Sequence, residues 1–543
     1  MNFVFKKTYA RFFTGLLLLA LLALQTPAQA SLSPVEKKLV KNVKVKEIRR
    51  VTEELSSDKY EGRGVLQPGG ERAAKWIAEQ MKRLGLKPLG DNGTYLQTVP
   101  FVETVFTDGT SVKLGGEELK LGTDWAAAGL LKDGRFPTPV PLAFIGYGQK
   151  NAERDDIKNH DLKGKIAVII EGAPAGMTAE QWANSGAVAA AFVNSAQAGA
   201  AALIIVANGR ETLPRPVLLD FASRRNISNP VDAKQPMPLP VLFVSDAAAE
   251  KMFAGSGMTF REALAKAETK EFAPLDLKPQ IEIALRSKQT PGDSYNVVGY
   301  FEGSDPALKS EAVVFSAHYD AFGLLNGKIY NGAADNAIGN GEMFAAAKAF
   351  SKMKPKPKRS LVFISVTAEE AGLQGSKYYG NNPTWDVTKI AANLNLDGIG
   401  SEITGPIKRM VGFGADYSTL GTLFADMTKL YGIQVMDDPI PEQRVFQRSD
   451  HYAFVQRGIP SLMLLGTSET TPEAFKKSFE MFETTKYHQP SDDVYADWYW
   501  PGAKTVADMM TIIGYRLADQ KEMPVWLTGN PYSNLKRGDV LPD

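Results

Sequence analysis

The pattern of apolar and polar positions changes twice along the chain, and each stretch predicts different elements. Between Ser31 and about Gly85, apolar residues recur at helical spacing, and Gly85 and Pro88 end the second of these stretches. From about Val140, short apolar runs alternate with turns around one alanine-rich helix. We expect strands at 142–145, 166–170, 201–206 and 239–244.

After roughly Pro279, buried strands alternate with helices. The apolar runs 296–301, 312–317, 361–366 and 461–465 have the composition of strands that are covered on both faces. Helical stretches such as 342–350 and 418–430 separate several of them. This alternation predicts an α/β fold, with a mostly parallel mixed sheet and helices on both faces.

The first thirty residues have the features of a targeting segment. Lys6, Lys7 and Arg11 precede an apolar run that is too short to span a bilayer, and Ala28-Gln29-Ala30 follows it. We therefore expect residues 1–30 to be a signal peptide that is cleaved near Ala30. The mature chain would be exported to the periplasm or secreted, without a membrane span.

Composition narrows the chemistry of the mature chain. The formal net charge of the whole 543-residue chain is +1, which argues against a nucleic-acid partner or an electrostatic membrane surface. The chain contains 0 cysteines, which excludes disulfides and thiolate chemistry. Any metal site must therefore use histidine and carboxylate side chains.

Histidine and carboxylate residues follow several of the predicted strands. His318 comes directly after the run 312–317, and Asp320 is placed to accept the second N–H of its imidazole. Asp335 lies among small residues, and Asp397 lies where another apolar segment stops. These positions predict side chains that converge at one edge of the sheet.

Two adjacent carboxylates and one further histidine complete the candidate set. Glu369 and Glu370 follow the run 361–366, where a cation would relieve their repulsion. One of them would bind metal and the other would accept a proton from water. His488 lies in a loop with Asp492 as a possible orienting residue. Two histidines and three carboxylates can hold two zinc ions if one carboxylate bridges them.

Five ordered motifs resemble the secreted bacterial di-zinc aminopeptidases, which are relatives of glutamate carboxypeptidase and the transferrin receptor. The motifs are His318-Tyr319-Asp320, Asn331-Gly332-Ala333-Ala334-Asp335-Asn336, the run from Glu369 to Ser376, Asn395-Leu396-Asp397 and Tyr487-His488. The resemblance implies an exopeptidase that releases N-terminal residues from peptides. It assigns one zinc to His318, Asp335 and Asp397, and a second to Asp335, Glu370 and His488. It also makes Glu369 the general base and Tyr487 the residue that stabilises the oxyanion.

The middle region resembles a protease-associated domain through Gly146-Tyr147-Gly148, Gly164-Lys165-Ile166 and Leu239-Pro240. We therefore expect an inserted, smaller, strand-rich domain at 136–278, between peptidase parts at 31–135 and 279–543. Its removal should leave the zinc site intact. The turn at 60–64 matches the family's N-terminal segment, with a substrate role or a buried ionic turn as equal alternatives. His451 is expected to be structural or to face the substrate.

Other activities on the same residues stay open. Gly398 stands where the family commonly has methionine, so the resemblance does not define the side-chain preference. Carboxypeptidase or dipeptidase action on the same metal core is the main alternative, and glutaminyl cyclisation is a remote one. A non-catalytic, receptor-like binding protein is disfavoured because the ligand set and the base are complete. The sequence does not specify the oligomeric state.

Overall fold

The computed structural model of the chain describes residues 31–128, 134–135, 139–152, 154–178, 181–182, 185–211, 214–231 and 239–541. The signal peptide expected at 1–30 lies outside these residues. In the part of the chain that is described, no helix has the length and apolar character needed to cross a membrane.

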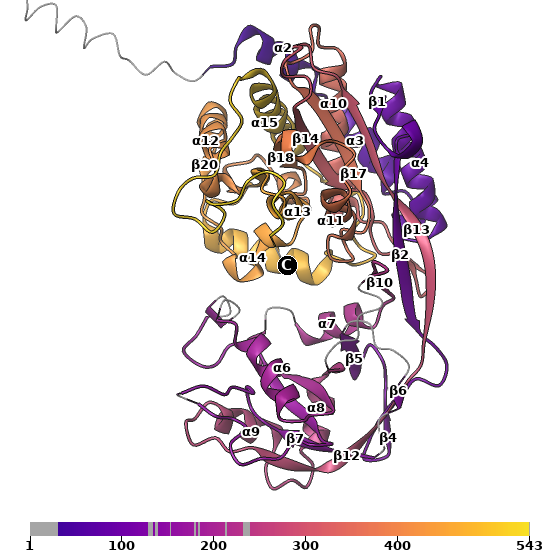
Figure 1. Ribbon diagram of the computed structural model, residues 1–543, viewed down its shortest axis with the longest axis vertical. Helices are drawn as coiled ribbons and strands as arrows, with labels where there is room; N and C mark the ends of the chain where they lie inside the picture. The colour runs from indigo at the N-terminus through magenta and orange to yellow at the C-terminus, as the bar shows by residue number, and fades with distance from the viewer. Residues whose placement is uncertain are drawn as a thin grey trace, which may run out of the picture.

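A ten-stranded sheet forms the core of the larger body, at the top of Figure 1. In spatial order its main strands are β10 (Asn226–Ser228), β2 (Leu96–Phe106), β13 (Ser287–Phe301), β17 (Ser360–Val366), β14 (Ala312–His318), β18 (Ile390–Asn395), β21 (Ser461–Thr467), β19 (Arg409–Phe413) and β20 (Gln434–Val435), with β1 (Lys87–Pro88) beside β13. Strands β17, β14, β18 and β21 run parallel at its centre. Strands β2 and β13 pair antiparallel with their neighbours, and β19 pairs antiparallel with β21 but parallel with β20. The sheet is therefore mixed, and most of its parallel pairs lie at the centre.

Helices cover both faces of this sheet, as the alternating pattern predicted. One apolar core joins alternate residues of β14, such as Val313 and Phe315, to the helices of the first face. These are α2 (Pro34–Asn42), α3 (Val45–Leu55), α4 (Pro68–Arg83), α10 (Ile338–Ser351), α12 (Leu420–Tyr431) and α15 (Trp500–Asp519). The other residues of β14, including Val314, pack with α11 (Gln374–Asn381) and α13 (His451–Val455). The helix α14 (Pro472–Thr485) lies farther along the chain.

A nine-stranded sheet forms the smaller body at the bottom of Figure 1. Its strands are β4 (Glu117–Leu119), β3 (Ser111–Leu114), β12 (Leu275–Leu285), β7 (Val140–Phe144), β8 (Ile166–Glu171), β9 (Ala202–Ala207), β11 (Val241–Val244) and β5 (Trp125–Ala128) in spatial order, with β6 (Gly134–Arg135) beside β12. Helices α6 (Ala187–Gln197), α7 (Arg215–Ala222), α8 (Asp246–Met252) and α9 (Phe260–Ala267) belong to the same region. The sheet therefore extends beyond 136–278 at both ends.

Two connections join the bodies. The long antiparallel ladder of β2 and β13 pairs Leu96 with Val297 and Phe106 with Ser287, and it runs toward the smaller sheet along one side of the molecule (Figure 1). The short strand β10, from the middle region, pairs with β2 at the edge of the larger sheet. The middle region thus contributes directly to the larger sheet.

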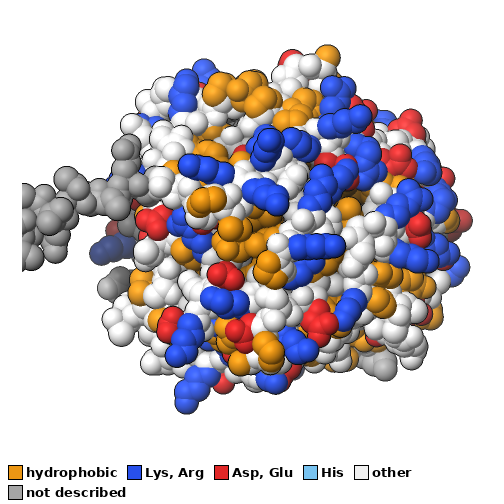
Figure 2. Space-filling model, turned by 90° about the horizontal axis from the view of Figure 1, so that it is seen from above, with side chains coloured by type: hydrophobic (Ala, Val, Ile, Leu, Met, Phe, Trp, Pro, Cys, Tyr) orange, Lys and Arg blue, Asp and Glu red, His pale blue; other side chains and the backbone are white. Residues whose placement is uncertain are grey.

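The surface carries charges of both signs. On the face drawn in Figure 2, Lys and Arg side chains are spread widely, with acidic and apolar side chains between them. This distribution agrees with a formal net charge of +1.

Candidate metal centre and cleft

The predicted ligands come from the carboxyl ends of adjacent parallel strands. His318 is the last residue of β14, Glu369 and Glu370 follow β17, and Asp397 follows β18. Because these strands are parallel neighbours, their ends meet at one edge of the sheet. Asp335 is supplied by the turn before α10, and His488 by the loop after α14.

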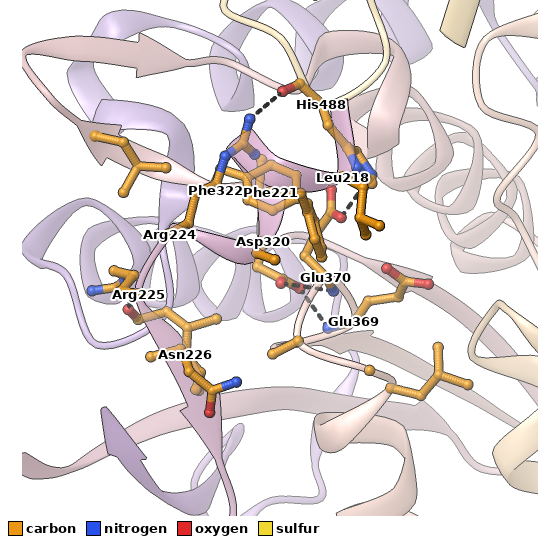
Figure 3. Close-up of a pocket in the computed structure, with 18 of the residues that line it drawn as sticks. Leu218, Phe221, Arg224, Arg225, Asn226, Asp320, Phe322, Glu369, Glu370 and His488 are labelled. Carbon is orange, nitrogen blue, oxygen red and sulfur yellow. Dashed lines mark hydrogen bonds and ion pairs between the residues drawn. The ribbon is translucent and has the colours of Figure 1, made fainter. Parts of the chain in front are cut away.

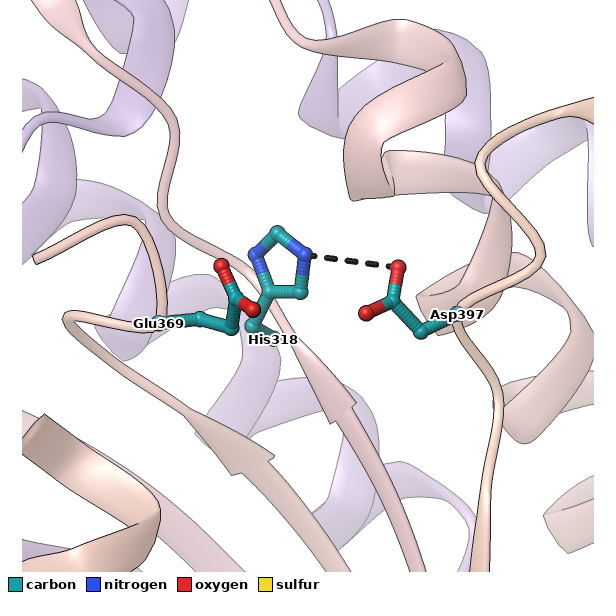
Figure 4. Close-up of side chains that lie close together, drawn as sticks. All are labelled: His318, Glu369 and Asp397. Atoms are coloured by element: carbon teal, nitrogen blue, oxygen red, sulfur yellow. Dashed lines mark ion pairs between the residues drawn. The ribbon is translucent and has the colours of Figure 1, made fainter. Parts of the chain in front are cut away.

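Asp335 lies between the two histidines and faces each with a different oxygen. Its Oδ1 is 3.1 Å from Nε2 of His318, and its Oδ2 is 3.4 Å from Nε2 of His488. Oδ1 of Asp397 is 3.6 Å from the same Nε2 of His318 (Figure 4). Oε2 of Glu370 is 2.9 Å from Nε2 of His488. The structure thus brings all five predicted ligands together around one shared carboxylate.

These donors fit transition-metal ions. His318, Glu369 and Asp397 form one group whose ligand atoms lie within 4.8 Å of one another, and Asp335, Glu370 and His488 form a second. Buried imidazole and carboxylate atoms without a hydrogen-bond partner point into the groups, namely Nε2 of His318, Nε2 of His488 and Oδ1 of Asp397. Imidazole and carboxylate ligands in groups of three suit zinc. Glu369 stands where Asp335 was expected in the first group, although Asp335 also reaches His318.

The electrostatics of the site favour added positive charge. Burial raises the pKa of Glu369 well above its usual range, and His318 only partly offsets that effect. Burial would lower the pKa of both imidazoles, but the surrounding carboxylates raise the pKa of His318 well above its usual range and that of His488 to about 9. A bound cation would supply the same positive charge without these protons.

The two residues expected to orient histidines have different partners. The backbone carbonyl of Asp320, at 3.2 Å, is nearer to Nδ1 of His318 than its carboxylate Oδ1, at 3.8 Å. The carboxylate of Asp320 instead accepts hydrogen bonds from the amides of Glu369 and Glu370. The carboxylate of Asp492 accepts from the amides of Ala334 and Asp335, at 2.8 and 3.0 Å. Both carboxylates therefore fix the backbone of the segments that carry the predicted ligands. The sequence predicts a different role for them, the orientation of the two imidazoles.

Arg63, in the turn at 60–64, supports the same loops. Its buried guanidinium donates hydrogen bonds to the carbonyls of Leu55, Tyr319, Asn331 and Gly332. Burial lowers its pKa to about 10 against the opposing effect of nearby acids, among them Asp492 and Asp320. The structure thus favours a buried ionic turn over a substrate-contacting one.

Tyr487 lies beside the centre. Its ring stacks on the imidazole of His488 with centroids 3.6 Å apart, and its hydroxyl lies 3.4 Å from Nη2 of Arg448. Burial raises the pKa of Tyr487 well above its usual range, so the hydroxyl keeps its proton and can donate a hydrogen bond. His451 is fully buried, and burial lowers its pKa to about 3, which agrees with a neutral structural residue. His160 pairs with Asp276 at 2.9 Å, in the smaller body.

A cavity of about 680 Å³ opens from the centre, and both bodies line it (Figure 3). Glu369, Glu370 and His488 lie at its metal end. Its apolar wall combines residues of the two bodies: Phe106, Leu218, Phe221, Phe243, Phe322 and Leu325. Basic side chains lie elsewhere in the lining: Arg224, Arg225, Lys377 and Arg448. Its volume is in the range of small-molecule sites.

Comparisons with known proteins agree with this arrangement. A model of Peptidase family M28 matches residues 296–512, which include all five ligand candidates. The fold is similar to that of the aminopeptidase from Aneurinibacillus sp. strain AM-1, with a TM-score of 0.59 and 20% identity over 90% of this chain and 97% of that one. It is also similar to BSAP, a zinc aminopeptidase from Bacillus subtilis, with a TM-score of 0.53 and 19% identity over 91% and 98% of the two chains. At these identities the similarity establishes the fold.

Curated relatives match over a shorter stretch. Leupeptin-inactivating enzyme 1 of Streptomyces exfoliatus is 30% identical over 181 residues, which are 33% of this chain and 37% of that protein. The chain thus spans about a third of the length of the first curated relatives it matches.

Proposed function

We propose that this chain is a zinc-dependent exopeptidase of the M28 type that releases N-terminal residues from peptides. The observation that carries the proposal is the position of Asp335, whose two carboxylate oxygens face Nε2 of His318 and Nε2 of His488 separately. A carboxylate shared in this way suits a pair of metal ions.

In the proposed site, His318, Asp335 and Asp397 would hold one zinc ion, and Asp335, Glu370 and His488 would hold a second. When bound, zinc polarises the scissile carbonyl and lowers the pKa of the attacking water. The ligand atoms of Glu369 lie close to those of His318 and Asp397. Glu369 is therefore placed either to bind the first zinc ion or to lie beside the attacking water. We assign it beside the water because Asp335 already reaches His318.

Glu369 accepts the proton of the water and passes it to the leaving amine. Burial raises its pKa, which suits a group that must both take up and release a proton near neutral pH. Tyr487 keeps its proton and donates a hydrogen bond to the oxyanion of the tetrahedral intermediate. The guanidinium of Arg448 lies beside the hydroxyl of Tyr487, where its positive charge favours the negative charge of the oxyanion.

Aminopeptidase action is supported by Glu369 at the metal end of the cavity, because a carboxylate that is not assigned as a metal ligand can complement a substrate ammonium group. Arg448 favours the second candidate, carboxypeptidase or dipeptidase action, because it lines the same cavity and could bind a substrate carboxylate. We further propose export through residues 1–30, and a protease-associated role for the smaller body in shaping access to the cleft.

The test is a panel of short peptides offered with free ends, with an acetylated N-terminus or with an amidated C-terminus. We expect zinc-loaded protein to cleave free and amidated peptides, to leave acetylated ones intact and to lose activity with a chelator. Cleavage of acetylated but not amidated peptides would move the assignment to a carboxypeptidase. Full activity in metal-free protein would overturn the zinc reaction itself.

A further inference from the structure

The ligand His488 is contacted by residues of the middle region. Helix α7 and the residues directly after it reach the loop that carries this histidine (Figure 3). The ring of Phe221 stacks on the imidazole, with centroids 5.7 Å apart and planes inclined by 20°. Nη2 of Arg224 donates a hydrogen bond of 3.1 Å to the backbone carbonyl of His488.

The backbone of His488 needs such support. Its φ of +57° places a residue with a Cβ in the left-handed region, which side-chain-bearing residues adopt only when their surroundings hold them there. The hydrogen bond from Arg224 fixes the carbonyl of this residue. The orientation of the imidazole and the conformation of the backbone are thus determined together.

Arg224 is held in place before it meets His488. Its side chain is only 9% exposed and forms an ion pair of 2.7 Å with Asp220, one turn earlier. Its guanidinium lies 4.5 Å from the ring centroid of Phe322 and 4.8 Å from that of Tyr330. Phe322 in turn meets the imidazole of His488 edge-on, with centroids 4.6 Å apart. A guanidinium fixed in this way loses little freedom when it binds the carbonyl.

The segment that carries these residues is attached to the larger sheet. Arg225 forms an ion pair of 2.5 Å with Glu103 of β2, and β10 pairs with β2 directly afterwards. The contacts argue against the expectation that removal of the middle region leaves the zinc site intact.

We propose that Arg224 and Phe221 are positioning residues for the second zinc site, through which the middle region sets the affinity of that site. They contact His488 and would act on the metal through it. The proposal rests on the proposed function, since it requires His488 to bind zinc.

The test compares the full-length Arg224→Met variant with wild type in a zinc titration against a competing chelator, with no activity readout. Methionine keeps much of the side-chain length and loses the donor. Loss of a residue that orients a metal ligand weakens metal affinity by about 10- to 100-fold. We expect this loss for one of two zinc ions, with the other unchanged. Arg224→Lys keeps the positive charge and should lose less zinc affinity. This variant replaces Arg224→Met in the titration if the methionine variant does not fold.

Arg215→Met is the matched control. Arg215 is a buried arginine at the first position of α7, nine residues before Arg224, with an ion pair of 2.9 Å to Glu171. Its variant should bind both zinc ions as wild type does. In a His488→Ala background, Arg224→Met should cause no further loss, because its effect passes through His488. Equal weakening by Arg215→Met, or unchanged affinity in both Arg224 variants, would overturn the inference. A wild-type protein that binds no zinc would instead overturn the proposed function.

Discussion

Two neighbouring glutamates have different surroundings, and this difference separates their proposed roles. Glu370 turns toward His488, with Oε2 at 2.9 Å from Nε2, whereas Glu369 groups with His318 and Asp397. Burial raises the pKa of both, and the opposing charge comes from His318 for Glu369 and from His488 for Glu370. Each carboxylate thus belongs to a different half of the centre.

Substitution by glutamine distinguishes these roles, because an amide keeps the size of the side chain and cannot accept the proton. Glu369→Gln should keep both zinc ions and lose about 10²–10⁴-fold in kcat, the usual cost of losing a general base. Glu370→Gln should lose affinity for one zinc ion and recover part of its activity in excess zinc. Zinc stoichiometry and kcat are measured side by side. If Glu369→Gln loses metal while Glu370→Gln keeps both ions, the two roles must be exchanged.

Gly398 stands where the resembling family commonly has methionine, and the structure shows what a side chain at this position would contact. A Cβ at this position would lie 2.7 Å from Oε2 of Glu402, which is buried behind Asp397. Burial raises the pKa of Glu402 to about 7, and the charge of Asp397 adds to the effect. A methionine at 398 would require the carboxylate end of Glu402 to move.

At the scale of elements, the turn containing Arg63 joins the N-terminal helices to the ligand loops. Four carbonyls from three segments accept hydrogen bonds from this one guanidinium: those of Leu55, Tyr319, Asn331 and Gly332. Two of these segments lead directly to Asp320 and Asp335. The turn therefore stabilises the fold and the site together.

Arg63→Lys should destabilise the protein, because a lysine cannot reach all four carbonyls and leaves buried acceptors unsatisfied. An unsatisfied buried acceptor costs about 1–3 kcal/mol, so we expect the free energy of unfolding to fall by at least about 2 kcal/mol. Urea unfolding of zinc-loaded protein measures it. Arg72→Lys is the control, because Arg72 is 43% exposed and bonds to Lys59 in the same segment. A similar loss in both variants would contradict the special role of Arg63.

The sequence predicted the strands that end at the site far better than the contacts between distant segments. Buried runs followed by His318, Glu370 or Asp397 carry a local signal, since the strand and its polar end are adjacent in the chain. The contact of Arg224 with His488 joins residues 264 apart, and a three-residue strand such as β10 has too little periodicity to detect. The sequence indicates a turn at 60–64 but not the hydrogen-bond partners of Arg63, because these depend on how remote loops fold.

At the scale of the whole molecule, the cleft depends on two bodies with separate apolar cores. One core lies around the larger sheet and another around the smaller one. The β2–β13 ladder and the segment around Arg224 connect them, and the cavity wall draws Phe322 from one body and Phe221 from the other. Any change in how the bodies meet should therefore alter the cleft and the proposed second zinc site together.

Stability should depend on pH differently with and without zinc. In the metal-free fold the pKa of His488 is raised to about 9, above the value of about 6.5 for an unfolded chain. A raised folded pKa stabilises the fold below pH 6.5, and this contribution is lost as the pH rises toward 9. The raised pKa values of Asp320 and Asp492, each about 7, act in the same direction because the folded state holds the extra proton.

We therefore expect the Tm of chelator-treated protein to fall between pH 6.5 and pH 9. Zinc binds the deprotonated ligands, so its stabilising effect should grow over the same range and offset the fall. Thermal unfolding across this range, with and without zinc, measures both trends. His488→Asn removes the imidazole that titrates in this window, so its metal-free Tm should change less with pH. A metal-free Tm that rises from pH 6.5 to pH 9 would mean that His488, Asp320 and Asp492 do not hold extra protons in the folded protein. The carboxylates of the centre would then not be balanced by protonated histidines when zinc is absent.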